Sequence, residues 1–550
     1  MIRMDVRALI LATSILIVSA GGACKRAPKA DFVFVNRGDI GTLDPNRMSW
    51  MQDIRIGYAL FEGLYALDPD TLDPVPGAAQ SIDVSTDKRI YTFHMRDNGR
   101  WSNGDPVTSN DFIFAWRRML EEPGDYTYLF FYITGARQYS DAFAKDPRSA
   151  DWNNVGIKAP DAKTLVVTLT NPTPFFPDIV AFAPMFPLNP KSMEKFRQVD
   201  SASGRTSYDA AFTQPPNLIT NGPYMLTRWQ LKVGQTLTKN PHYWDAANVI
   251  SNTIESQNYD DPLLAFQKYD QGEVDWLADT TGDIAAQLRD AGRKDVKIFP
   301  SFGTYFYSFN CKPLLPGNRK NPFADVRVRQ ALTMAIDKNP VVQNVTKLGE
   351  PITSVYVPPT FPTYKHPTGL PYDVEKAKSL LAEAGYPGGK GFPPVKLTFN
   401  TEFNDHKLIA EIISRQWNEK LGINIELDGV EIKQFQARLH DKDYDVARAS
   451  WYGDYNDVST FTDKYLSDSL NNDSAWVNPE YDRLLHAAEK EIDPQKRLDL
   501  LSQAEQILVT EVPIIPLYHY VNKYVMRDNV KGVPLNPRNM VIFKKVTAGR

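Results

Sequence analysis

Cysteine is scarce in this chain. Only Cys24 and Cys311 occur among 550 residues. Small secreted domains that rely on disulfides carry several paired cysteines, whereas a chain of this length can bury a core large enough to fold without them. We therefore predict no disulfide, and we expect Cys311 to be a buried, inert thiol.

Basic tracts and a strong net charge are also missing. The chain has 62 Lys and Arg against 66 Asp and Glu, which gives a net charge of −4, and no run of five or more basic residues interrupts it. A protein that tracks nucleic acid normally presents a clustered positive surface. The composition therefore excludes nucleic acid as an expected partner.

Catalytic and metal-binding motifs are absent as well. The chain contains no Gly-x-Ser-x-Gly elbow, no His-Glu-x-x-His pair and no P-loop lysine, and its seven histidines never form a close ligand pair. We expect no cofactor and no local metal motif. A carboxylate-based catalytic site assembled by folding remains open.

The amino terminus carries the only export signal that we identify. Arg3 and Arg7 precede an apolar run over residues 8–18, which is too short to span a membrane, and small residues follow. This pattern predicts a signal peptide over 1–23. The Gly-Gly-Ala stretch before Cys24 resembles a lipoprotein cleavage site, which implies lipidation of Cys24. Because Gly21 replaces the usual leucine, ordinary signal-peptidase cleavage is the alternative.

What the sequence does contain is typical of a large globular protein. Hydrophobic residues make up 42% and aromatic residues 12% of the chain, whose length predicts two to four domains. We expect strands at 32–35, 90–95 and 164–169, and a helix over 110–120 behind a cap at Ser109.

The segment 373–427 gives the clearest pattern. A helix capped by Asp373 and ended by Gly385 precedes a strand over 395–399, a second helix that carries apolar residues from 408 to 421, and a strand over 423–427. A further helix runs from 493 to about 508. A strand, a helix and a strand in succession predict a parallel sheet, and hence an α/β fold.

One carboxylate has unusual surroundings. Asp454 lies in the stretch 445–456 among Trp451, Tyr452 and Tyr455. Aromatic neighbours exclude water, so a carboxylate there needs a cation or several donors. A peptide's α-ammonium group is one such cation. A structural ion pair with Arg448, or an acidic cap for a helix that starts at Ser459, would satisfy the charge equally well.

Several motifs carry a resemblance to a known family. The chain resembles the periplasmic oligopeptide-binding proteins, the extracytoplasmic receptors of ABC peptide transporters, through the stretch around Asp454 and through the motifs at 42–45, 60–64, 101–108, 221–224, 240–244, 321–332 and 538–540. The resemblance implies a type II periplasmic-binding-protein fold, with two lobes joined by a two-segment hinge near Gly303 and Tyr520, plus an extra inserted domain. The implied division is a tether at 24–31, lobe 1 at 32–62, 191–303 and 521–550, the inserted domain at 63–190 and lobe 2 at 304–520.

The resemblance also implies site residues. Asp454 would bind the peptide α-amino group, with Trp451 and Tyr452 as walls of the first side-chain pocket. Arg448 would meet a ligand carboxylate, or instead form a bridge to Asp445 or Asp454. Further ligand-binding candidates are Tyr520 at the hinge, His440 near the peptide end, and Tyr128 from the inserted domain, with Tyr126 as an equal alternative. Gly303 and Tyr452 occupy positions of bridged cysteines in close relatives.

The function that this resemblance implies is binding, not catalysis. We expect a monomeric receptor that encloses a short peptide between its lobes and delivers it to a membrane ABC permease, with the membrane reached through lipid at Cys24 if that residue is modified. The alternatives are the same fold binding a dipeptide, a cell-wall peptide, a sugar or a metal complex, and an extracytoplasmic peptide hydrolase or chaperone.

Overall fold

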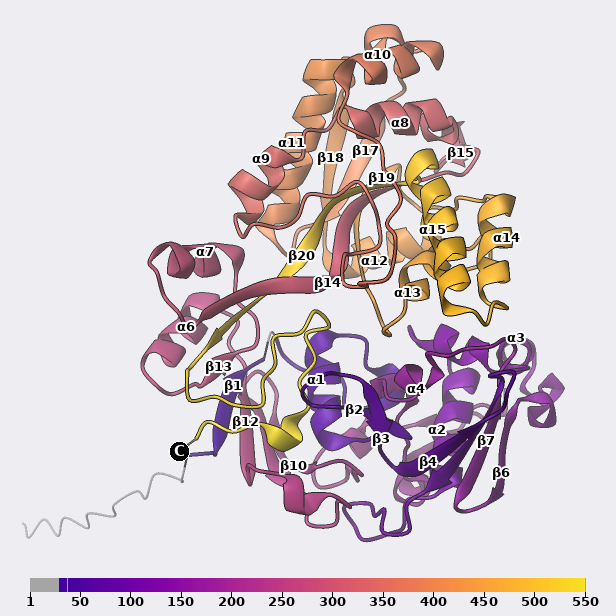
Figure 1. Cartoon of the computed structure of the whole chain (residues 1–550), viewed down its shortest axis with the longest axis vertical. Coiled ribbons are helices and arrows are strands. Elements are labelled where there is room, and N and C mark those ends of the chain that lie inside the picture. Colours follow the sequence, from indigo (N-terminus) through magenta and orange to yellow (C-terminus); the bar gives the residue numbers. More distant parts are fainter. Residues whose placement is uncertain (1–28, 37, 550) are drawn as a thin grey trace, which may run out of the picture.

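The computed structural model describes residues 29–36 and 38–549, so the expected signal peptide and Cys24 lie outside the described residues. Figure 1 shows two bodies, one above the other in that view, linked by two long strands, β14 (Val296–Phe309) and β20 (Ile514–Met526). None of the helices in the described part of the chain is both long and apolar enough to cross a membrane.

The largest sheet of the described chain runs through both bodies. It has ten strands in the order β10-β11-β12-β1-β13-β20-β14-β19-β17-β18. Apart from β14 and β20, these strands are β1 (Phe32–Val35), β10 (Tyr224–Gln230), β11 (Gly234–Lys239), β12 (Thr253–Gln257), β13 (Trp276–Leu277), β17 (Val395–Asn400), β18 (Ile425–Val430) and β19 (Val446–Tyr452).

The two long strands pair antiparallel with each other, and the pairing is interrupted between Pro300 and Thr304. Gly303 lies in this interruption on β14, and Tyr520 lies on β20. Both positions that the resemblance implies for the hinge therefore fall on the strands that connect the two bodies. A connection of two strands leaves bending and twisting as the available relative motions.

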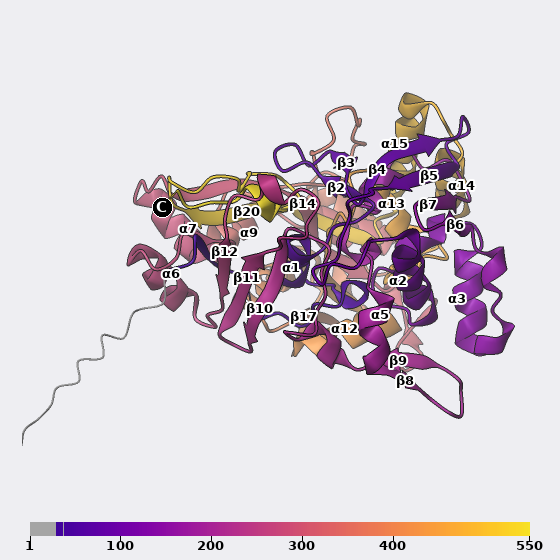
Figure 2. The same ribbon diagram turned by 90° about the horizontal axis from the view of Figure 1, so that it is seen from below.

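The segment that follows α1 (Met51–Leu60) builds a separate antiparallel sheet. Its strands, in spatial order, are β4 (Ala79–Val84), β5 (Ile90–Met95), β7 (Thr164–Thr168) and β6 (Ile157–Asp161). Figure 2 shows this sheet with α2 (Ser109–Glu121) and α3 (Ala136–Lys145) at one end of the molecule, and α6 (Pro262–Asp270) and α7 (Gly282–Asp290) at the other.

The predicted α/β segment is confirmed. Asp373 accepts a hydrogen bond from the N–H of Lys376 and caps α10 (Val374–Glu383). Strand β17 pairs in parallel with β18, and α11 (Asn404–Leu421) connects the two strands. Gly422 ends α11 at a φ of 70°, a conformation that glycine adopts without steric cost. The capping residue, the apolar period of the helices and the terminating glycine are all local signals, which is why this segment could be predicted.

The expected cap at Ser109 is wrong by one residue. The N-cap of α2 is Thr108, whose N–H donates to the Asp111 carboxylate at 2.8 Å. A threonine three residues before an acidic side chain forms this reciprocal cap, so Ser109 begins the helix instead. The remaining long helices are α8 (Val326–Met334), α12 (Ile432–Asp441), α14 (Pro479–Ala488) and α15 (Pro494–Glu511), which Asp493 caps as predicted.

The apolar core follows the two bodies. One cluster joins β1, β12, α1 and the four-stranded sheet, and includes Trp101, Trp116 and Trp276. Two further clusters fill the other body, one around Trp417 between α8, α10 and α11, and one around Phe461 between α14 and α15. Tyr455 belongs to the first cluster although its chain neighbours belong to the second body. The Tyr455 side chain therefore packs in the core of the other body.

Candidate functional site

The candidate residues lie on β19 and on the loop that follows it. Strand β19 pairs antiparallel with β14 from Gly303 opposite Tyr452 to Phe309 opposite Val446. Because side chains alternate along a strand, Arg448 and Tyr452 lie on one face of β19 and Trp451 lies on the other. The site consequently has two parts: one on the face of β19 that carries Arg448 and Tyr452, and one formed by Trp451 and by Asp454 of the following loop.

Tyr452 reaches across β14 to the neighbouring strand. Its ring stacks on that of Tyr520 with 4.9 Å between the centroids and 18° between the planes. Gly303 lies between them: a β-carbon at that position would be 2.6 Å from the Tyr452 ring. The missing side chain at Gly303 is therefore what permits this stacking. Tyr452 remains 42% exposed, so the stacked pair offers an aromatic surface to solvent.

Arg448 joins the same part of the site. Its Nη2 donates to the Tyr520 hydroxyl at 3.0 Å, and its guanidinium lies over the Tyr305 ring at 4.9 Å. Its Nε is buried and has no hydrogen-bond partner. The alternative of a bridge to Asp445 or Asp454 is wrong, because Asp445 accepts instead from both terminal nitrogens of Arg319. Among the described residues, Arg448 forms no salt bridge.

Asp454 forms the second part of the site. It is 9% exposed, and its carboxylate accepts a hydrogen bond from the Tyr128 hydroxyl, while its own N–H donates to Thr460 Oγ1 at 2.9 Å. No basic side chain in the described residues lies within salt-bridge distance of the carboxylate. The predicted alternatives do not hold: Arg448 is not its partner, and the acid that caps the turn at Ser459 is Asp457.

Burial changes the protonation of this acid. Loss of hydration raises the pKa of Asp454 to about 7, although the Tyr128 hydrogen bond and the charges of Arg538 and Lys464 oppose the rise. A buried carboxylate without a counterion is costly to ionise. A cation brought to this position would stabilise the ionised form, so the site is suited to bind a positively charged group.

Trp451 is held in place beside this acid. Its Nε1 donates to the Thr460 carbonyl at 2.7 Å, so the same residue that receives the Asp454 N–H also fixes the indole. The Lys464 ammonium lies over the indole ring at 4.6 Å and donates to Asp473 at 2.9 Å. Trp451 and Tyr452 thus flank different parts of the site.

Two expectations concerned residues farther from β19. Tyr128 and Tyr126 were equal candidates, and the structure brings Tyr128 to Asp454, whereas the Tyr126 ring packs against Phe182 with 5.0 Å between the centroids. His440, on α12, has a side chain 83% exposed that contacts Asp441 at 3.2 Å. In this structure His440 does not join either part of the site.

Several residues of this region were not predicted. Arg538 forms two hydrogen bonds with the Asp178 carboxylate, at 2.8 and 3.0 Å, and a third with the backbone oxygen of Asp454 at 3.2 Å. Asp178 also accepts from the N–H of Asn456. The motif that contains Arg538 was noted in the sequence, but no local signal connects it with Asp178, which is 360 residues away.

Further contacts between the two bodies accompany the hydrogen bond from Tyr128 to Asp454. The Tyr132 hydroxyl is 2.7 Å from that of Tyr455 and donates to Asp463 at 3.0 Å. The rings of Tyr455 and Phe175 are stacked, 4.9 Å apart and nearly parallel. Burial raises the pKa of Asp463 to about 8. The two bodies therefore meet through aromatic rings and tyrosine–carboxylate hydrogen bonds.

Cys311 is a free thiol that is partly exposed, and burial of its sulfur raises its pKa to about 11. The thiol is therefore protonated and unreactive at neutral pH. Within residues 29–36 and 38–549, no group of three or more His, Cys, Asp or Glu side chains could hold a metal ion.

The fold and the site together define a two-lobed binding protein, with charged and aromatic side chains where the lobes meet. The chain belongs to the bacterial extracellular solute-binding proteins, family 5: the profile of the family's middle region matches residues 73–473. The expected class of fold, the type II periplasmic-binding-protein fold with an extra domain, is confirmed by this family and by its solved structures.

Curated relatives match over nearly the whole chain. The oligopeptide-binding protein OppA of Bacillus subtilis is 33% identical over 496 residues, which cover 88% of this chain and 86% of the relative. The periplasmic oligopeptide-binding protein OppA of Salmonella typhimurium is 31% identical over 535 residues, which cover 96% and 93%.

Solved structures agree in fold. The murein tripeptide binding protein MppA of Escherichia coli superimposes with a TM-score of 0.80 at 30% identity, covering 95% of this chain and 99% of the other. The unliganded open form of MppA gives a lower TM-score of 0.71 at the same identity, with coverage of 95% and 98%. Haemophilus influenzae OppA in complex with the peptide RPPGFSPFR gives 0.79 at 28% identity, covering 94% and 99%. The arrangement of the lobes in this chain is therefore less similar to the open form of MppA than to the other MppA structure.

Proposed function

We propose that this protein is an extracytoplasmic receptor that encloses a short peptide between its two lobes and delivers it to an ABC permease. The observation that carries the proposal is the Asp454 carboxylate, which is buried, accepts a hydrogen bond from Tyr128 of the inserted domain, and has no basic side chain within salt-bridge distance in the described residues. The α-ammonium group of a peptide supplies the missing charge.

A carboxylate can accept more than one donor, so Tyr128 and a ligand ammonium can share Asp454. Arg448 supplies the complementary charge on β19, six positions earlier, and binds the ligand carboxylate or an acidic side chain. Tyr452 and Tyr520 provide an aromatic surface beside it. Backbone hydrogen bonds along an extended peptide are the same for every sequence, so this arrangement tolerates many side chains.

The division of the chain follows the same proposal. Residues 304–520 form lobe 2, residues 63–190 the inserted domain, and residues 32–62, 191–303 and 521–550 lobe 1. The separate core clusters support the boundary of lobe 2, but one cluster is continuous through lobe 1 and the inserted domain. The inserted domain and lobe 1 are therefore expected to move as a single body against lobe 2.

The relatives support the identity of the ligand and the location. Names of relatives specify oligopeptides, dipeptides and murein peptides, and several specify the periplasm. One relative is named as a probable deoxycholate-binding protein, so the fold also accommodates other ligands. Asp454 favours a ligand that bears an amine. The chain is proposed to act as a monomer outside the cytoplasm, anchored by lipid if Cys24 is modified.

Calorimetry with paired peptides tests the proposal. Unmodified tetra-alanine should bind, and its N-acetylated form should bind at least about tenfold more weakly because the ammonium is lost. Asp454→Asn should weaken binding of unmodified tetra-alanine by about 2 to 5 kcal/mol. Asp499→Asn, an exposed acid on α15, should leave the affinity unchanged. Equal affinity for both peptide forms would contradict the proposed role of Asp454.

The same experiment separates a receptor from a hydrolase. After incubation, mass spectrometry of the peptide should return it intact. Cleavage products that increase with protein concentration and time would favour the hydrolase alternative instead.

A further inference from the structure

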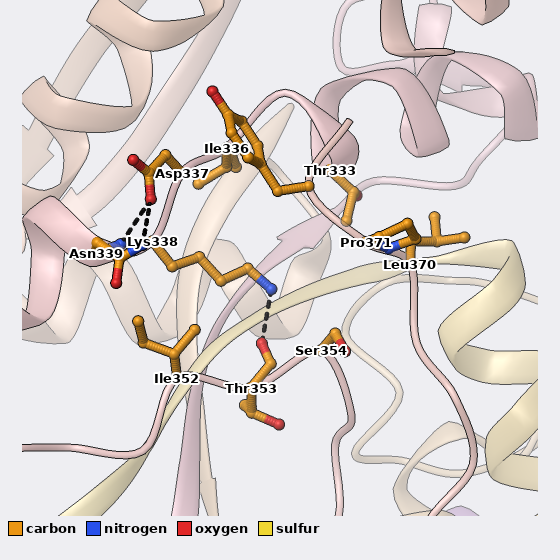
Figure 3. Close-up of a pocket in the computed structure, with 11 residues that line it drawn as sticks. Thr333, Ile336, Asp337, Lys338, Asn339, Ile352, Thr353, Ser354, Leu370 and Pro371 are labelled. Atoms are coloured by element: carbon orange, nitrogen blue, oxygen red, sulfur yellow. Dashed lines mark hydrogen bonds between the residues drawn. The ribbon is translucent and has the colours of Figure 1, made fainter. Parts of the chain in front are cut away.

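A cavity lies in lobe 2, outside the candidate peptide site. It is formed by the end of α8, the start of α9 (Asn339–Val341), the segment 352–354 and the segment 370–372, and has a volume of about 250 Å3. Ligand cavities for drug-sized molecules are roughly 300 to 1,000 Å3, so this one suits a smaller guest. Figure 3 shows the Lys338 side chain extending across the cavity.

The Lys338 ammonium has few partners. Its Nζ donates to the Thr353 carbonyl at 2.6 Å, the single hydrogen bond that it makes among the described residues. It forms no salt bridge there. An ammonium group has three donors, so two remain available. Burial lowers the pKa of Lys338 to about 8. A shielded cation without a counterion is stabilised by an anion that enters the cavity.

The lining restricts the kind of anion. Ile336, Ile352, Leu370 and Pro371 form the apolar part of the lining, and polar residues such as Thr333 and Ser354 form the rest. Asp337 also lines the cavity, where its Oδ1 accepts from the backbone and side-chain nitrogens of Asn339 at 3.0 and 2.9 Å. The Lys338 ammonium attracts an anion, and the fixed Asp337 carboxylate beside it repels a dianion more strongly than a monoanion.

We infer that this cavity is a second ligand site, specific for a small monocarboxylate with an apolar body, whose carboxylate binds the Lys338 ammonium. The site is distinct from the peptide site and does not depend on the proposed peptide function. The backbone of its wall pairs with the connecting strand, since Thr353 N–H donates to the Leu517 carbonyl at 3.1 Å and Ile352 bridges Tyr518 on β20. A bound carboxylate would therefore stabilise the segment that holds β20 near Tyr520.

Calorimetry with benzoate, benzamide and inorganic phosphate tests this inference near neutral pH. Benzoate should bind. Benzamide, which lacks the charge, and phosphate, which lacks the apolar body, should each bind at least about tenfold more weakly. Absence of benzoate binding at about ten millimolar, or phosphate or benzamide binding as tight as benzoate, would overturn the inference.

Variants and protection assign the binding to Lys338. Lys338→Met should reduce benzoate affinity at least about tenfold, whereas Lys376→Met, an exposed lysine on α10, should not. On the unaltered protein, benzoate should slow reductive methylation of Lys338, measured by mass spectrometry, while benzamide should not. Methylation of Lys338 at the same rate with and without benzoate would overturn the inference even if Lys338→Met does not fold.

Discussion

The hydroxyl of Tyr128, in the inserted domain, donates a hydrogen bond to the carboxylate of Asp454, which follows 326 residues later in lobe 2. This contact links the two bodies at the acid that is proposed to bind the ligand. The contact between the two bodies and the electrostatics of the site therefore involve the same carboxylate. A ligand that adds a positive charge there would favour closure by its greater affinity for the closed form.

Peptide binding should release a proton from Asp454. The pKa of this acid is raised to about 7, so near pH 6 it is mostly protonated. A bound ammonium stabilises the carboxylate and lowers that pKa, so affinity should increase as pH rises from about 5 to 7. Above about pH 8 the free peptide loses its own α-ammonium charge, and affinity should fall.

Calorimetry in buffers of different ionisation enthalpy measures this proton. Release should approach about one proton per peptide near pH 6 and about half a proton near pH 7. Asp454→Asn should abolish the release. A wild-type binding enthalpy that is independent of the buffer near pH 6 would show that Asp454 is already ionised before the peptide binds.

Tyr128→Phe should weaken peptide binding moderately near pH 7. The hydroxyl lowers the pKa of Asp454, so its loss makes the acid harder to ionise, by roughly 1 kcal/mol for one hydrogen bond. The loss of affinity should become smaller near pH 8, where the carboxylate is ionised in both proteins. Tyr126→Phe is the matched control, because that ring packs on Phe182 and its hydroxyl does not bond to Asp454. Equal effects of the two substitutions would indicate a general packing change.

Arg448→Met should remove discrimination between peptides with a free carboxylate and peptides with an amidated C-terminus. The wild-type protein should prefer the free carboxylate, since the buried Arg448 Nε has no partner and the guanidinium has no salt bridge in the described residues. The expected loss is about 2 to 5 kcal/mol for the free acid and much less for the amide. Arg415→Met, on the exposed side of α11, should preserve the preference. Should both peptides lose the same affinity, Arg448 shapes the site without contacting the carboxylate.

Gly453→Ala should destabilise the protein by about 1 to 3 kcal/mol, measured by urea unfolding. A β-carbon at residue 453 would lie 2.0 Å from the Phe302 ring, a rigid neighbour that cannot move without disturbing lobe 2. Phe302→Leu in the same chain should recover part of the loss. Gly99→Ala provides the control, because its nearest neighbours would be at an ordinary 3.6 Å. Unchanged stability of Gly453→Ala would mean that the loop shifts freely.

The predictions from sequence succeeded where the signals were local. Asp373 and the apolar positions of α11 concern residues within one or two helical turns, so the α/β unit of β17 and β18 could be predicted from spacing alone. Asp454 was also found locally, because glycine and aromatic residues surround it. Ser109 was predicted as the cap in place of Thr108 because both residue types cap helices, and only the backbone geometry distinguishes them.

Composition, residue spacing and motifs were enough to predict the class of elements, the family and Asp454 as the acid that is proposed to bind the ligand. The fold was needed to show that Tyr128, and not Tyr126, donates to this acid, and that Arg538 pairs with Asp178 and donates to the Asp454 carbonyl. It also assigns the cap of the turn at Ser459 to Asp457 and not to Asp454. The Tyr128–Asp454 and Arg538–Asp178 contacts join residues that are 326 and 360 positions apart. Spacing along the chain does not show which distant residues come into contact, because those contacts are set by how the lobes pack around β14 and β20.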